Sequence, residues 1–155
     1  ENVMSELQSE FLFEMKLDVS PGLSMGKTPF GKRWFAEVTG GSFAGPRMRG
    51  RALPGGGDWA LMRADHVLQL DVRITLETDD GAIVYVTYRG ARHGPKDVIA
   101  RLAAGEPVDP ADYYFRTAPF FETASEKYAW LDGIICVGKG QETPDGVIYR
   151  LFQVL

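Results

Sequence analysis

The chain has 155 residues, of which 45% are hydrophobic and 25% are charged, a composition typical of one soluble globular domain. The net charge of −4 at pH 7 repels polyanions, so we expect no nucleic-acid partner. Neither a signal peptide nor an apolar run near the ~20 residues of a membrane span is recognisable, so we expect a cytoplasmic protein without membrane contact. We expect a flexible N-terminus at residues 1–6 and a single domain over residues 7–155.

Alternating apolar and polar residues predict the strands of the N-terminal half. Residues 7–19 alternate with period two and predict a first strand, after which residues 21–31 predict a turn-rich loop. Further strands are expected at residues 33–39, at the run that carries Arg47, Arg49 and Arg51, and at residues 59–63. The last of these follows a glycine-rich reversal at residues 54–57, which delivers Asp58 and Trp59 to the strand.

Two alternating runs, residues 71–78 and 82–89, flank Asp79-Asp80-Gly81 and predict a β-hairpin. With Asp80 and Gly81 as a two-residue loop, Arg73 lies directly opposite Tyr88 on one face. The other face is then the buried one, with Val72, Ile74, Leu76, Ile83 and Tyr85. The face that carries Arg73 also carries Asp71, Thr75, Glu77, Val84, Val86 and Tyr88, and is either a solvated outer surface or the lining of a semi-polar cavity.

The C-terminal half predicts one short helix among further strands. The helix is expected at residues 95–104, with Val98, Ile99 and Leu102 packed over one barrel end. Strands are expected at residues 113–117, 130–138 and 147–155, and Pro119 indicates an edge or a bulge. Without βαβ alternation, the pattern predicts an all-β fold, a closed or nearly closed antiparallel β-barrel of about eight to ten strands. A β-sandwich is the alternative.

The motifs of cofactor and metal sites are absent from the sequence. There is no glycine-rich phosphate loop, and His66, His93 and Cys136 are too few for a site rich in His or Cys, so we expect neither cofactor nor metal. A carboxylate metal site is not excluded. Cys136 lies in an apolar run, which indicates a buried, inert thiol.

Several blocks of residues, in order, resemble one known family. The blocks are residues 40–47, 56–59, 71–73, 76–81, 92–95, 114–117, 121–123 and 128–131. They resemble the domain of unknown function family 3237, also called uncharacterised protein family 0311, over nearly the whole chain. The resemblance implies a small antiparallel β-barrel. A few members of the family resemble cofactor-free cyclases that act on aromatic polyketides by proton transfer, and no catalytic residues follow from the resemblance.

Three positions depart from the pattern of that family, and each adds a proton-transfer group. Asp65-His66 stands in place of Asp-Gly, Tyr88 begins a run in place of Asn-Arg-Gly, and Asp132 replaces the Asn of Trp-Leu-Asn. These substitutions either are neutral or indicate a member with its own substrate.

We therefore expect a cofactor-free cyclase, isomerase or lyase that moves protons on an unsaturated or phenolic, polyketide-like small molecule. The catalytic candidates are Asp58 as general base or acid, Arg73 as stabiliser of an enolate or phenolate, and Tyr88 as a phenolic donor. Trp59 is expected to be at least half buried and to line the cavity. The substrate-binding candidates are Trp59, His66, Glu77, Tyr114, Arg116, Trp130 and Asp132.

Two other interpretations remain open at this point. One is a small-molecule-binding barrel without turnover, similar to lipocalins. The other is a purely structural salt-bridge network of Asp58, Arg73, Arg116 and Glu122 that holds the barrel. A homo-oligomer is compatible with either interpretation.

Overall fold

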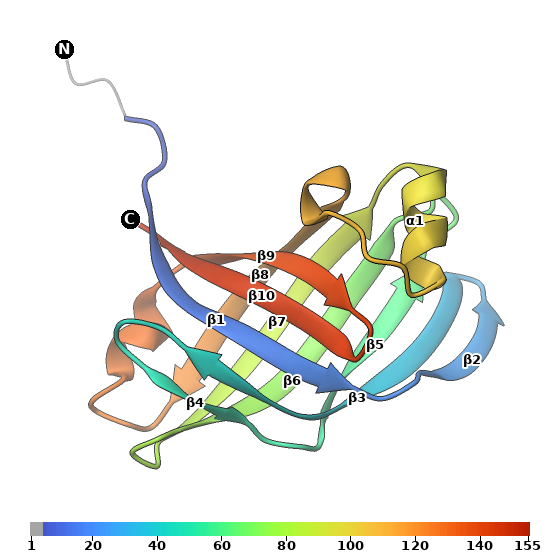
Figure 1. Ribbon diagram of the computed structural model, residues 1–155. Helices are drawn as coiled ribbons and strands as arrows, with labels where there is room; N and C mark the ends of the chain where they lie inside the picture. Colours follow the sequence, from blue (N-terminus) through green and yellow to red (C-terminus); the bar gives the residue numbers. More distant parts are fainter. Residues whose placement is uncertain (1–4) are drawn as a thin grey trace.

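The computed structural model describes residues 5–155 (Figure 1). The expectation of a flexible N-terminus falls mainly on residues 1–4, which lie outside the described residues. The strands are β1 (Ser9–Val19), β2 (Leu23–Thr28), β3 (Gly31–Ala44), β4 (Arg49–Ala52), β5 (Gly56–Met62), β6 (Leu68–Thr78), β7 (Ile83–His93), β8 (Tyr114–Thr123), β9 (Cys136–Thr143) and β10 (Gly146–Val154). The helices are α1 (Lys96–Ala103) and the 3-10 turns η1 (Pro110–Asp112) and η2 (Ala129–Gly133).

All strands belong to one antiparallel sheet that closes on itself. β1 pairs with β10 on one side and with β3 on the other, which joins the two ends of the sheet. β4 and β5 share one position, because each pairs with both β3 and β6 at different ends of these long strands. The result is a closed barrel of eight strand positions, with β2 outside it against β3. The predicted all-β barrel is confirmed, and the sandwich alternative is wrong.

The hairpin of β6 and β7 has a different register from the one expected. Thr78 donates its N–H to the Ala82 carbonyl at 2.9 Å, so the loop has three residues, Asp79 to Gly81, with Gly81 at φ +89°. This is a turn that ends in a left-handed residue, a common three-residue hairpin loop. Arg73 therefore lies opposite Thr87, and Val72 lies opposite Tyr88.

The shift of one residue changes which side chains share a face. Val72, Ile74 and Leu76 point into the barrel together with Val84, Val86 and Tyr88. The outer face carries Asp71, Arg73, Thr75 and Glu77 with Ile83 and Tyr85. The expected pairing of Arg73 with Tyr88 on one face is thus wrong. The register is shifted because the loop is one residue longer than expected. The Asp80 carboxylate accepts hydrogen bonds from the hydroxyls of Thr78 (2.6 Å) and Tyr128 (2.9 Å) and so stabilises the longer loop.

The barrel interior is filled unevenly along its axis. At the end near β4, Phe13 packs on Phe43 and Phe121 with ring centroids 5.1 and 6.1 Å apart. Fully buried Met15, Leu76 and Leu131 complete this part of the core. At the opposite end two inward positions, one on β3 and one on β5, carry the small side chains of Ala36 and Ala60. Because close-packed interiors leave few voids, this difference in side-chain size determines where a cavity can form.

Three local expectations for loops and edges are resolved by the structure. The loop expected at residues 21–31 is wrong, because strand β2 forms there and pairs with β3. The strand expected from Trp130 begins only at Cys136, since η2 precedes it. Pro119 lies within β8, which pairs with β9 only at Arg116 and Thr117. The expected edge at Pro119 is therefore confirmed.

The helix α1 lies beside the barrel end where β7 finishes (Figure 1). It follows Pro95, whose fixed φ suits a helix start, and Val98 is buried. Ile99 and Leu102 are half-buried, and Leu102 packs against the core. The predicted apolar stripe is therefore docked on the barrel, as a helix of this length requires for stability.

Replacing Asp80 with Asn is expected to lower the melting temperature at neutral pH. The hydrogen bonds from Lys127, Thr78 and Tyr128 hold the pKa of Asp80 well below its usual range. The stabilisation is therefore complete above the unfolded pKa of about 3.9 and is lost as the pH falls below that value. Thermal unfolding of both proteins between about pH 7 and about pH 3 should show the two melting temperatures converging in acid.

The neighbouring substitution Asp79→Asn is the matched control. Among residues 5–155 the Asp79 carboxylate pairs with Arg49 alone, and both side chains are largely exposed, so its loss should change the melting temperature much less. A difference between Asp80→Asn and wild type that stays constant with pH would contradict the role given to the carboxylate.

Candidate functional site

A cavity of about 220 Å³ lies inside the barrel at the end near α1. Side chains from every strand position of the barrel contribute to it, so we call it the interior pocket. Its lining consists of Val19, Trp34, Ala36, Val38, Asp58, Ala60, Leu68, Leu70, Val72, Arg92, Phe115, Glu142, Thr143, Gly146, Val147 and Tyr149. The walls are mainly apolar, with a few ionisable groups, which is the usual character of a small-molecule site.

Asp58 enters the interior pocket from β5. Gly57 precedes it and lies so close to Phe35 that a Cβ there would be 2.3 Å from the ring. This close packing holds the strand against its neighbour. The ladder between β5 and β6 is interrupted at Trp59 and Ala60, and Asp58 Oδ1 accepts the Asp71 N–H at 3.0 Å beside this gap. One carboxylate oxygen is thereby fixed, while Oδ2 has no hydrogen-bond partner among residues 5–155.

The surroundings of Asp58 raise its pKa to about 6. Burial of the carboxylate in the apolar pocket is the main cause, and the nearby Asp71 carboxylate adds to it. The hydrogen bond from the Asp71 N–H and the more distant Arg33 guanidinium act in the opposite direction. Asp58 consequently changes its protonation state near neutral pH, as a general acid or base requires.

An ion pair between Arg92 and Glu142 forms part of the pocket wall. Arg92 Nη1 donates to Glu142 Oε1, and only 11% of the Arg92 side chain is exposed. The backbone N–H of Glu142 donates to the Tyr113 hydroxyl at 2.9 Å, which fixes this part of β9. Arg92 Nε is buried and has no hydrogen-bond partner among the described residues. One donor of the guanidinium is therefore left unpaired next to the ion pair.

Tyr149 lies in the pocket wall, and Tyr88 packs behind it. Their rings contact edge to face with centroids 5.3 Å apart. Burial raises the pKa of both hydroxyls, and the Asp58 carboxylate raises them further. Both phenols therefore stay protonated at neutral pH and can only donate or accept hydrogen bonds.

Two leading candidates from the sequence lie on the outer face of the barrel. The Arg73 guanidinium is exposed and donates to the Tyr85 hydroxyl at 3.3 Å. Trp59 stacks on Phe35 with centroids 4.6 Å apart and is 40% exposed. It is thus more than half buried, as expected, but its ring does not line the interior pocket. The reason is strand alternation, since Asp58 points inward and its neighbour must point outward.

The remaining candidates are also outside the pocket. His66 sits in the exposed turn before β6, and Glu77 pairs with Arg51 at 3.0 Å on the outer face. Tyr114 stacks on His93, and Arg116 donates to the Phe115 carbonyl. Trp130 and Asp132 lie in η2, where Arg47 covers the indole and the carboxylate accepts the Thr123 N–H. Of the ten candidate residues, Asp58 alone lines the interior pocket.

The structural-network interpretation finds no support in the ion pairs. Within residues 5–155, no salt bridge includes Asp58, Arg73, Arg116 or Glu122.

In the same part of the chain, no group of three or more His, Cys, Asp or Glu side chains could hold a metal ion. The described residues also include no helix that is long and apolar enough to cross a membrane.

Arg92, Glu142, Tyr149 and Trp34 are pocket residues that the sequence interpretation missed. For Arg92 and Glu142 the sequence did contain a signal, because residues that face into the barrel recur at every second position of β7 and β9. With the correct register, the inward positions of β7 run Val84, Val86, Tyr88, Gly90 and Arg92, so a cation ends an apolar series. A buried series that ends in a charge indicates a polar group at the barrel mouth. Nothing in the sequence shows that Glu142, 50 residues away, pairs with it.

Replacing Asp58 with Asn is expected to stabilise the protein at neutral pH. A carboxyl group whose folded pKa lies above its unfolded value lowers the stability as the pH rises between the two values. A shift from 3.8 to about 6 corresponds to about 3 kcal/mol, and the amide keeps an acceptor for the Asp71 N–H. Urea unfolding should therefore show Asp58→Asn to be more stable than wild type at about pH 7 and nearly equal below about pH 4.

The outward carboxylate Glu37 provides the control, since Glu37→Gln alters an exposed side chain on β3. It should leave the free energy of unfolding nearly unchanged at both pH values. If Asp58→Asn were less stable than wild type at neutral pH, Asp58 would have a structural role instead.

Comparison with known proteins places this barrel among relatives of similar length. Bacterial UPF0311 proteins are 36% identical in Rhodopseudomonas palustris and 37% identical in Bradyrhizobium diazoefficiens, each over 149 residues, 96% of this chain and 97% of the relative. A protein named a hydroalkoxylation enzyme, from Penicillium herquei, is 28% identical over 129 residues, which cover 83% of this chain and 71% of that protein.

Solved structures share the same fold. A conserved protein of unknown function from R. palustris has a TM-score of 0.94 and 36% identity, covering 98% of this chain and all of that one. A β-barrel-like protein from Acinetobacter baumannii has a TM-score of 0.87 and 36% identity, with both chains fully covered. An enzyme from P. herquei, at 22% identity, has a TM-score of 0.76 over 100% of this chain and 99% of its own, and shows the fold alone. Because residues 7–154 also match the family described as protein of unknown function (DUF3237), this chain belongs to that family.

Proposed function

We propose that the interior pocket is the active site of a cofactor-independent cyclase or isomerase that acts on a small unsaturated or phenolic molecule by acid-base proton transfer. The observation that carries the proposal is Asp58, a carboxylate with a pKa of about 6 in an apolar pocket beside the Arg92–Glu142 pair. A group with this pKa can both accept and return a proton near neutral pH.

The size of the pocket sets the class of substrate. Its volume of about 220 Å³ exceeds that of a cavity of ~150 Å³, which is large enough for benzene. Aromatic and branched aliphatic walls, including Trp34, Leu70 and Phe115, favour a planar, apolar ring. A one-ring or two-ring phenol or enol with a conjugated double bond fits this description.

Each polar group has a distinct role in the proposed reaction. The Asp58 carboxylate takes the proton from a substrate hydroxyl, and the negative charge moves through the conjugated system to a second oxygen. Arg92, which lines the pocket, stabilises that oxygen as a permanent cation. Protonated Tyr149 donates a further hydrogen bond, and Tyr88 acts only through Tyr149, by positioning its ring.

The atoms of such a reaction balance without an oxidant or a reductant. When the hydroxyl oxygen adds to a conjugated C=C, a C–O bond forms and the C=C becomes a single bond. The proton held by Asp58 then goes to the carbon next to the carbonyl, which regenerates the carboxylate. The name of the P. herquei relative, a hydroalkoxylation enzyme, denotes this type of addition and supports the proposal.

A suitable test substrate is ortho-hydroxyphenyl propenyl ketone, which cyclises to a methylchromanone. Wild-type protein should accelerate the cyclisation, and in deuterated water one deuterium should enter the carbon next to the carbonyl. Asp58→Asn should lower kcat/KM by about 10²- to 10⁴-fold, the usual contribution of a general acid or base. Glu37→Gln, with its exposed carboxylate, should retain the wild-type rate.

The pH profile provides an independent check of the same assignment. Since the ionised form of Asp58 is the base, kcat/KM should rise with pH through about 6 and then level off. A profile that falls through about 6 would assign Asp58 as the initial acid instead and would overturn the order of steps given above.

The binding-barrel alternative predicts a different outcome in this assay. A lipocalin-like barrel would bind the ketone, measured by quenching of tryptophan fluorescence, but would not accelerate its cyclisation or exchange its protons. Binding without turnover by wild-type protein would therefore replace the enzyme proposal with that alternative.

A further inference from the structure

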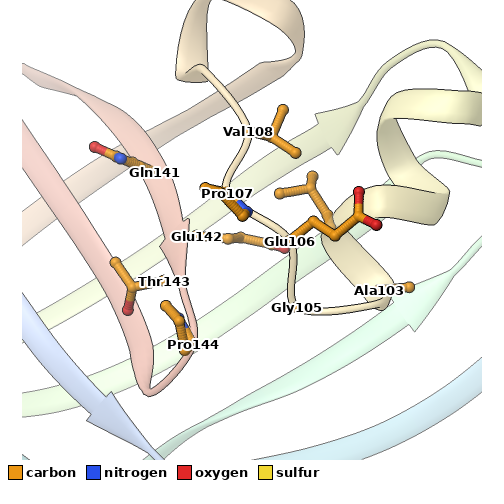
Figure 2. Close-up of a pocket in the computed structure, with 10 residues that line it drawn as sticks. Ala103, Gly105, Glu106, Pro107, Val108, Gln141, Glu142, Thr143 and Pro144 are labelled. Carbon is orange, nitrogen blue, oxygen red and sulfur yellow. The ribbon is translucent and has the colours of Figure 1, made fainter.

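A second cavity, of about 380 Å³, adjoins the interior pocket, and we call it the vestibule (Figure 2). On one side it is lined by Leu102 of α1 and by Pro107 and Val108 of the segment that joins α1 to η1. On the other side it is lined by Glu142, Thr143 and Pro144, at the β9–β10 turn. In Figure 2 the loop with Pro107 and Val108 runs opposite the strand with Glu142 and Thr143.

The vestibule and the interior pocket share two consecutive lining residues. Glu142 and Thr143 line both cavities, so the two cavities adjoin at the end of β9. The Glu142 carboxylate lies at this junction and binds Arg92 of the interior pocket. The interior pocket of about 220 Å³ lies below the ~300 to 1,000 Å³ of sites for larger organic ligands, and it reaches that range when the vestibule of about 380 Å³ is added.

The lining of the vestibule determines what it can accept. None of its lining residues is basic, so a carboxylate or phosphate group would find no counter-charge there. Its two acids are already paired, Glu142 with Arg92 and Glu106 with Arg101 at 3.1 Å. Leu102, Pro107, Val108 and Pro144 provide apolar surface, and Gln141 and Thr143 add uncharged polar groups. The vestibule therefore suits an uncharged, largely apolar group.

From these shared lining residues and this lining we infer that the interior pocket and the vestibule form one binding site for a two-part substrate. The reactive ring occupies the interior pocket, and an uncharged apolar chain on that ring extends past Glu142 and Thr143 into the vestibule. This inference rests on the proposed function of the interior pocket and adds the substituent that its substrate carries.

The test compares two phenols by isothermal titration calorimetry. para-Ethylphenol reaches only the interior pocket, and para-hexylphenol adds a chain that reaches the vestibule. Wild-type protein should bind the hexyl compound at least about tenfold more tightly, because its additional methylene groups leave water. Leu102→Trp fills the vestibule from the helix side, and Pro144→Trp fills it from the exposed turn on the other side.

Both tryptophan variants should weaken binding of para-hexylphenol at least about tenfold and change that of para-ethylphenol less than about twofold. Ala100→Trp is the control, since Ala100 is an exposed residue of α1 outside the vestibule, and it should leave both affinities unchanged. Pro144→Trp keeps the test valid if Leu102→Trp displaces the helix.

The outcomes separate this inference from the proposed function. If para-ethylphenol binds but Pro144→Trp leaves the hexyl affinity unchanged, or weakens both phenols equally, the two-part site is overturned while the interior pocket stands. If wild-type protein binds neither phenol, the interior site is overturned and the inference with it.

Discussion

The pairing of β1 with both β10 and β3 is the constraint on which the rest of the structure depends. It closes the sheet, satisfies the backbone groups of both edges and divides every strand into inward and outward residues. The interior then has two parts. Large aromatic and aliphatic side chains fill the end near β4, whereas small residues such as Ala36 and Ala60 leave space at the end near α1. The pocket follows from closure and from this difference in size.

Within that space, the burial of Asp58 has opposite effects on stability and on reactivity. Moving a carboxylate into an apolar wall disfavours its charged form, which lowers the stability of the folded state at neutral pH. The same burial brings the pKa of Asp58 close to the pH at which proton transfer is efficient. A protein that retains such a residue in its interior gives up stability that an amide at the same position would restore.

The sequence was sufficient for the fold class and for the expectation that Asp58 lies at a cavity, and insufficient for most of the other residues that line the interior pocket. Period-two alternation and the absence of long helices predict a closed barrel, and the glycines before Asp58 indicate the close strand approach that Gly57 makes. The error arose at Asp79-Asp80-Gly81, where two-residue and three-residue loops are both compatible with the local sequence. Tyr128, which lies 48 residues away and binds Asp80, favours the longer loop, and its contact is invisible in the local pattern. The resulting shift of one residue placed Val84, Val86 and Tyr88 on the same face as Arg73. In the structure these residues of β7 point into the barrel, as does Arg92.

The interior pocket receives side chains from every strand position, and this distribution affects how the specificity of the barrel can change. The lining of the pocket is spread over the barrel, and each strand position supplies one to three of the wall residues. Exchanging an inward residue such as Ala60 or Leu70 reshapes one part of the wall, while the backbone hydrogen bonds of the barrel and its outer charges stay as they are. The interactions that close the barrel are therefore largely different from the side chains that shape the pocket. If the proposed function holds, new substrates can be accommodated one inward side chain at a time, with Asp58 and Arg92 kept in place.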